Sequence, residues 1–141
     1  MARLVDSKNS IALKLYPHRI SDEEEPIWVS TLLQFEVKGH RRVSDSLSMT
    51  LPDIDDLIAG LEALVIEQKQ AFSITTMDND FMLSICPESR VERAFVVQFW
   101  YGEPFLLMSG YRFIVGKETI ESFVQELKDE RGKIKAGAKL P

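Results

Sequence analysis

The chain has 141 residues, of which 45% are hydrophobic and 28% charged, and a formal net charge of −5. Such totals predict one soluble globular domain, and no run approaches the ~18 apolar residues of a membrane span. The acidic balance argues against nucleic acid and anionic membranes as partners, since both reward clustered Lys and Arg. Arg3 and Asp6 interrupt the N-terminus, which therefore does not resemble a secretory signal peptide, and we expect a cytoplasmic protein.

The first ten residues are polar and are expected to be loose. Residues 11–16 alternate as a short strand would, and Pro17 should end it. The acidic run from Asp22 to Glu25 then predicts an exposed loop, because such charges are rarely buried. Residues 28–39 and 43–51 alternate between apolar and polar positions on either side of a turn, which predicts an antiparallel hairpin.

The stretch MTLPDIDDLIAGLEALV, residues 49–65, leads into a predicted amphipathic helix over residues 53–69. Asp53, Asp55 and Asp56 fall at its start, where the helix dipole favours negative charge and an aspartate can cap free N–H groups. Asp55 and Asp56 lie about 100° apart around a helix, so they diverge rather than converge on a metal ion. Helix initiation is the favoured interpretation, and an acidic contact surface stays open.

Residues 71–77 and 81–86 flank the sequence Asp-Asn-Asp, which predicts a tight hairpin. Residues 94–102 are apolar on both parities, as in a strand that is central or covered on both faces. Residues 105–116 also have two apolar faces, and Ser109-Gly110 predicts a bulge or bend. Residues 117–135 form a second predicted amphipathic helix. Its apolar spacing echoes that of the first helix, although amphipathic helices share such spacing in general.

The predicted order is β-β-β-α-β-β-β-β-α. This is an α+β fold with an antiparallel sheet of about seven strands and two amphipathic helices on one side. We expect a single domain over residues 1–141, with an ordered core of about 10–132 and loose termini.

The sequence offers no arrangement of residues that predicts catalysis. There are two histidines, His18 and His40, no nucleophile motif, no phosphate loop and no paired-cysteine metal spacing. The single cysteine, Cys86, ends an apolar run and is expected to be a buried or half-buried, inert strand residue. We therefore predict no catalytic, cofactor-binding or metal-binding residues, and a protein that is not an enzyme.

The candidate partner-binding residues are instead two acidic groups and a tryptophan. An acidic group can steer and hold a basic partner, and a tryptophan on the polar side of a strand can be an interface residue. The candidates are Asp22, Glu23, Glu24, Glu25, Trp28, Asp55 and Asp56. For Trp100, packing in the core or on a sheet face is expected instead.

The tryptophan-led strand, the helix entry SMTLPDIDDLIAGLEAL and the following hairpin resemble the small bacterial WapI-type immunity proteins. The matching positions are Trp28, Leu51, Pro52, Asp56, Leu57, Leu61 and Leu64. The resemblance implies a non-enzymatic protein that neutralises a toxin by stoichiometric binding, and a basic toxin domain would complement the acidic chain. The alternative is a small ligand-binding or self-associating domain, with a homodimer formed through a sheet face or edge.

Overall fold

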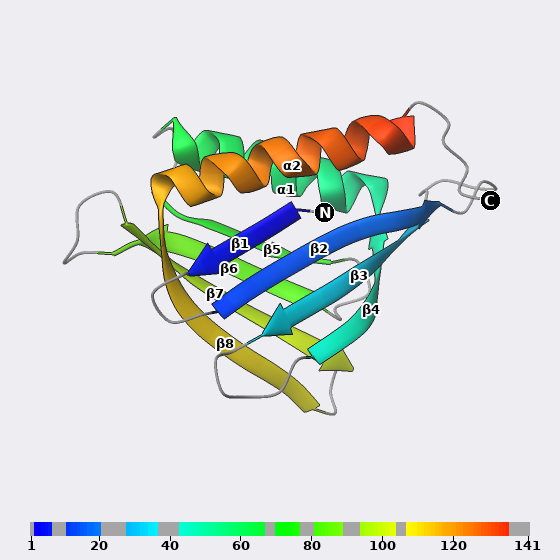
Figure 1. Cartoon of the computed structure of the whole chain (residues 1–141), viewed down its shortest axis with the longest axis horizontal. Coiled ribbons are helices and arrows are strands. Elements are labelled where there is room, and N and C mark those ends of the chain that lie inside the picture. The colour runs from blue at the N-terminus through cyan, green and yellow to red at the C-terminus, as the bar shows by residue number, and fades with distance from the viewer. Residues whose placement is uncertain are drawn as a thin grey trace.

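A computed structural model of the chain describes residues 2–6, 11–20, 28–36, 43–66, 70–76, 81–88, 94–103 and 107–135 (Figure 1). Four strands and a helix are followed by four more strands and a second helix. The first half holds β1 (Ala2–Asp6), β2 (Ile11–Ile20), β3 (Trp28–Glu36), β4 (Val43–Thr50) and α1 (Leu51–Val65). The second half holds β5 (Phe72–Thr75), β6 (Phe81–Pro87), β7 (Ala94–Glu103), β8 (Leu107–Gly116) and α2 (Lys117–Lys135).

The strands form two four-stranded antiparallel sheets, ordered β1-β2-β3-β4 and β5-β6-β7-β8. The predicted α+β class, with antiparallel pairing and two helices, is confirmed. The prediction of about seven strands in one sheet is wrong, because the described residues form eight strands in two sheets. Along the chain, α1 lies between β4 and β5, and the four strands on each side of it form a sheet of their own.

The strand that the prediction missed is β1, which pairs with β2 and contains two fully buried residues, Ala2 and Leu4, each 0% exposed. The expectation that the first ten residues are loose is therefore wrong for Ala2–Asp6. A five-residue segment with three apolar residues, Ala2, Leu4 and Val5, is too short a pattern for a sequence-based assignment. The strand is held by tertiary contacts, since β1 packs against α2 as well as pairing with β2.

Pro17 does not end the second strand, contrary to the sequence prediction. β2 continues to Ile20, and its register with β3 shifts between Pro17 and Arg19. A proline has no N–H to donate to a ladder, and bulges are among the places where a sheet accommodates it.

The first helix begins at Leu51 and ends at Val65, within a few residues of the prediction. The amide of Asp53 donates to Thr50 Oγ1 at 3.2 Å, and the Thr50 amide donates to Asp53 Oδ2 at 2.9 Å, which makes a reciprocal capping box. The interpretation of Asp53 as a helix-initiating residue is confirmed. The second helix, α2, has the bounds that the sequence predicted.

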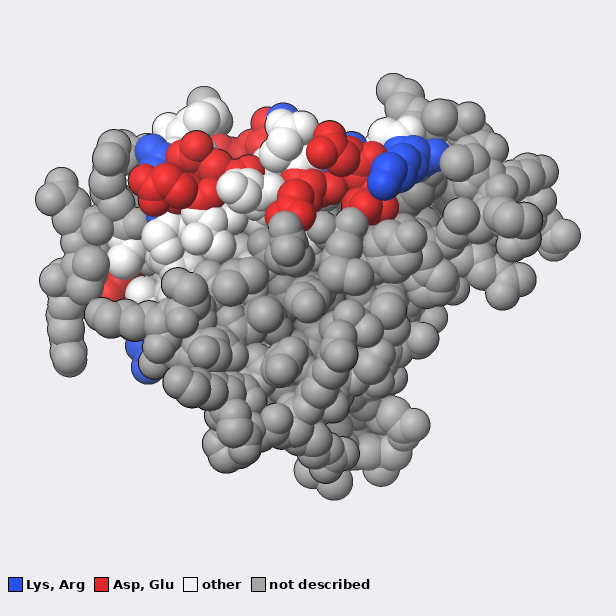
Figure 2. Space-filling view, viewed as in Figure 1, with Lys and Arg blue, Asp and Glu red and all other residues white. Residues whose placement is uncertain are grey.

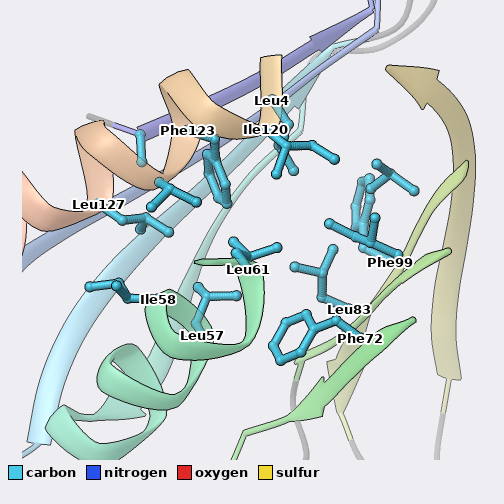
Figure 3. Close-up of a cluster of buried hydrophobic side chains, with 14 of the residues drawn as sticks. Leu4, Leu57, Ile58, Leu61, Phe72, Leu83, Phe99, Ile120, Phe123 and Leu127 are labelled. Carbon is cyan, nitrogen blue, oxygen red and sulfur yellow. The ribbon is translucent and has the colours of Figure 1, made fainter. Parts of the chain in front are cut away.

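The two helices lie side by side above the two sheets (Figure 1) and are called the helical layer below. Buried side chains from both helices and both sheets form one hydrophobic cluster (Figure 3). Its largest fully buried members are Phe81, Phe99, Phe123, Leu4, Met49, Ile54, Leu57 and Leu61. Burying such a side chain contributes about 1.5–3 kcal/mol, so this cluster is the main source of stability.

Gly60 sets how closely α1 can approach the β5–β8 sheet. A Cβ added to Gly60 would lie 1.9 Å from a ring carbon of Phe72, the first residue of β5. Only a glycine fits at this crossing, because any larger residue would overlap the phenylalanine ring.

The two halves of the chain repeat the same pairing at an offset of 66 residues. Val29 pairs with Met49 on β3 and β4, and Phe95 pairs with Val115 on β7 and β8. The buried stripe of α1 recurs at the same offset in α2, where Ile54, Leu57, Ile58 and Leu61 correspond to Ile120, Phe123, Val124 and Leu127. The echo between the predicted helices is therefore part of a structural repeat of four strands and one helix.

Candidate functional site

The outer face of the β5–β8 sheet is the sheet surface whose side chains the structure describes best. Along β6, Phe81, Leu83 and Ile85 are buried, whereas Met82 and Ser84 between them are half-buried. Successive side chains of a strand point to opposite faces, so Met82 and Ser84 face away from the core. The exposed or half-buried side chains of this face are Ser73, Thr75, Met82, Ser84, Cys86, Gln98, Trp100, Arg112 and Ile114.

The strand register places these side chains in rows across the sheet. Met82 of β6 pairs with Trp100 of β7, which pairs with Gly110 of β8. One row further along, Ser84 pairs with Gln98, which pairs with Arg112. The pairing of β7 with β8 is regular through Gly110, so of the two alternatives predicted for Ser109-Gly110 the bulge is wrong.

Trp100 and Arg112 are diagonal neighbours on this face, because Arg112 lies two residues beyond Gly110, the partner of Trp100. Diagonal positions on adjacent strands are about 7–8 Å apart at the Cα atoms, within reach of long side chains. Trp100 is half-buried, Arg112 is exposed, and glycine places no side chain beside the indole on β8. The face thus combines an aromatic ring, a guanidinium group and the amide of Gln98.

The described part of this outer face carries no carboxylate. The helical layer is the opposite, as Figure 2 shows, with acidic side chains spread over both helices. α1 and α2 together hold nine Asp and Glu residues against five Lys and Arg residues, a balance of −4. The rest of the chain, with 13 acidic and 12 basic residues, is almost neutral.

Three basic side chains of the helical layer are engaged by its own carboxylates. Arg131 donates from Nε to Asp55 Oδ1 at 2.7 Å and from Nη2 to Asp55 Oδ2 at 3.3 Å. Lys128 Nζ lies 3.2 Å from Glu62 Oε1, and Lys133 Nζ lies 3.4 Å from Glu130 Oε1. The first two pairs join α1 to α2, and they show that the helices run antiparallel.

The structure gives the predicted partner-binding residues different surroundings. Asp55 and Asp56 are exposed on α1, but Asp55 is already paired with Arg131. Trp28 is the first residue of β3 and a Cα partner of Thr50, and its side chain lies outside the description. The acidic run Asp22 to Glu25 also lies outside the described residues, so those four positions stay a prediction.

Gln98 and Arg112 were not singled out in the sequence, and Trp100 was assigned to packing. Residues 94–102 predict a strand that is central or covered on both faces; β7 is indeed central, between β6 and β8, but Gln98 and Trp100 on its outer side are half-buried. Cys86, expected to be at most half-exposed, is exposed. One feature of the sequence could have indicated this face. Gln98 and Arg112 are polar residues within sets of alternate positions that are otherwise largely apolar, and they lie opposite each other on two adjacent strands.

Within the described residues, no helix is long and apolar enough to cross a membrane. The same residues contain no group of three or more His, Cys, Asp or Glu side chains arranged to hold a metal ion.

No family model and no curated protein matches this chain, so the resemblance to the WapI-type family stays a prediction. The fold matches the plant transcriptional regulator PBF-2 with a TM-score of 0.56 and 12% identity, over 95% of this chain and 83% of that one. It matches MRP1/MRP2 of Trypanosoma bruciei with a TM-score of 0.54 and 10% identity, over 94% and 79%. A guide-RNA-binding protein complex bound to a gRNA gives 0.50 and 8%, over 87% and 91%.

These matches correct the predicted function and partners. The fold is shared with a guide-RNA-binding complex and a transcriptional regulator, which contradicts a toxin-neutralising protein with no nucleic-acid partner. The error came from treating the net charge of −5 as a property of the whole surface. Since −4 of it lies on the two helices, the charge says little about a ligand of the sheets.

Proposed function

We propose that this protein binds single-stranded nucleic acid, without catalysis, through the outer face of the β5–β8 sheet. The observation that carries the proposal is the diagonal placement of Trp100 and Arg112 on a face whose described part has no carboxylate. Support also comes from the fold, because one protein that shares it is a guide-RNA-binding complex bound to a gRNA.

The chemistry of the face matches a nucleotide strand with accessible bases. An unpaired base can stack on the Trp100 indole, which is worth about 1–3 kcal/mol per base in proteins that bind single strands. Arg112 can contact a phosphate or stack on a base, and Gln98 and Ser84 can donate to base edges or phosphates. A duplex hides its base faces, so a sheet face with one half-buried indole favours the single strand.

Stacking rather than charge should supply most of the affinity. The eight strands carry four acidic and four basic residues, so the sheets offer no large positive field. We therefore expect a modest affinity with a shallow dependence on salt. RNA and DNA present the same base faces and phosphates, and the experiment below includes both.

The test measures binding of fluorescein-labelled single-stranded RNA and DNA, and of the matched duplexes, by fluorescence anisotropy. Trp100→Ala should weaken binding of the single strand about tenfold, whereas Trp100→Phe, which keeps an aromatic ring, should recover most of the affinity. Equal binding of duplex and single strand, or unchanged affinity in Trp100→Ala, would overturn the proposal.

Tryptophan fluorescence gives an independent reading of the same contact. The chain has two tryptophans, so in the Trp28→Phe variant Trp100 is the single emitter. Added single-stranded oligonucleotide should quench this emission if bases stack on the indole. A variant that binds the oligonucleotide without quenching would place the nucleic acid elsewhere.

A further inference from the structure

A groove opens in the helical layer where the end of α1 lies against the first half of α2. Its volume is about 290 Å³, and its lining combines apolar and charged side chains. The lining residues are Glu62, Val65, Ile66, Glu121, Val124, Gln125 and Lys128. None of them belongs to the outer face of the β5–β8 sheet, so the groove is a separate site.

The apolar part of the groove is unusually accessible to solvent. Ile66, the C-cap residue of α1, is 62% exposed, which is the largest exposed fraction of any described large hydrophobic residue. Val65 is half-buried beside it, and Val124 of α2 is buried. A partner that covered Ile66 would gain about 25 cal/mol for each Å² of apolar surface removed from water.

The charged part of the groove is acidic. Lys128 is its one cation, and its Nζ lies 3.2 Å from Glu62 Oε1. Glu121 is exposed on α2 and forms no ion pair with another described residue. The groove thus presents a negative balance within a layer that is itself acidic, which attracts a positive ligand.

We propose that this groove binds a short basic segment of a partner protein, with one apolar side chain inserted beside Ile66 and flanking Lys or Arg residues facing Glu62 and Glu121. The volume is at the lower limit of about 300–1,000 Å³ for ligand pockets, so it fits one or two side chains rather than a cofactor. A second copy of this chain is a poorer fit, because two helical layers would bring charges of the same sign together.

The probe is a fluorescein-labelled peptide of about twelve residues that alternates pairs of Leu and Lys, the pattern of a basic amphipathic segment. Two matched peptides replace Leu by Ser or Lys by Glu. We expect the Leu-Lys peptide to bind the full chain about tenfold more tightly than either. Backbone amide shifts in NMR should move at Val65, Ile66 and Val124.

The decisive variants separate the groove from the general acidity of the helices. The double variant Glu62→Gln/Glu121→Gln and the single variant Ile66→Ser should each weaken binding about tenfold. The matched control Glu118→Gln/Glu126→Gln removes two helical carboxylates outside the groove and should change binding by less than about twofold. Circular dichroism checks that every variant is folded.

Three results would overturn the proposal. Equal losses in the groove variant and its matched control would mean that the peptide is held by diffuse charge. Unchanged binding in Ile66→Ser would remove the apolar contact. Sedimentation of the unmodified chain as a dimer that Ile66→Ser dissociates would assign the groove to contact between copies.

Discussion

The helical layer and the outer face of the β5–β8 sheet belong to one small fold, yet they expose different chemistry. The helices carry nine carboxylates, and three of their cations are held in ion pairs. The described outer face of the sheet has no carboxylate and offers Trp100, Gln98 and Arg112. Among the described side chains, the two exposed large hydrophobic residues divide in the same way, with Ile66 at the groove and Ile114 on the sheet. Net charge therefore describes neither surface.

The largest expected effect concerns the contact between α1 and β5, where the helical layer packs against the β5–β8 sheet. Gly60→Ala would put a methyl group within 1.9 Å of the Phe72 ring and should cost about 2–3 kcal/mol of unfolding free energy, measured with urea. The matched control is Gly132→Ala, where an added Cβ has no neighbour within 4 Å. That change should stabilise the protein by about 0.5–1 kcal/mol through helix propensity. Similar results for both glycines would contradict the close approach of α1 to β5.

The salt dependence of nucleic-acid binding tests whether the sheet face or the overall charge of the protein holds the nucleic acid. Arg112→Gln should weaken single-strand binding about fivefold and reduce the slope of log affinity against log salt by about 0.7, as expected for one lost phosphate contact. The control Lys117→Gln removes a positive charge at the start of α2, away from the sheet face, and should leave the slope unchanged. A slope that falls equally in both variants would mean that overall charge, rather than the sheet face, carries binding.

Within the helical layer, the three aspartates of α1 should differ in their effect on stability. Asp53→Ala removes one half of the capping box and should cost about 0.5–1 kcal/mol in thermal or urea unfolding. Asp56→Ala removes an exposed carboxylate with no described ion pair and should cost about 0.3 kcal/mol or less. If the two changes cost the same, the carboxylates would act through the helix dipole alone.

The smallest expected effect lies at the contact between Asp55 and Arg131. This pair is bidentate but partly exposed, so solvent screens it and its coupling energy should be about 0.5 kcal/mol or less. A double-mutant cycle with Asp55→Asn and Arg131→Gln measures the coupling. It should fall further in about 1 M salt. A coupling above about 1 kcal/mol would show that the pair does more than link the ends of the two helices.

Local patterns were enough to predict the helices and most strands. The apolar stripe and the proline at its start predicted α1. The bounds of α2 were predicted correctly, because its apolar period and the placement of its charges indicate the same helix. β1 escaped prediction because its two buried residues become informative only once β2 and α2 lie beside them. The prediction that the strand ends at Pro17 was wrong for a similar reason, because the proline is accommodated by an irregular register between β2 and β3.

The candidate site was beyond local patterns. Trp100 and Gln98 sit in a strand that is apolar on both parities, which predicts burial on both faces. Whether an outer face is covered depends on what packs there, and this is decided by segments far away in the sequence. The neighbourhood of Trp100 and Arg112 likewise follows from the register of β7 and β8 rather than from either strand alone.

The sequence by itself determined the α+β class, the antiparallel hairpins, the two amphipathic helices and the role of Asp53, because each depends on residues a few positions apart. Tertiary structure alone decided the division into two sheets, the inclusion of β1 and the exposure of Trp100. Those features depend on which surfaces pack together, and this packing is made by contacts between segments that are far apart in the sequence.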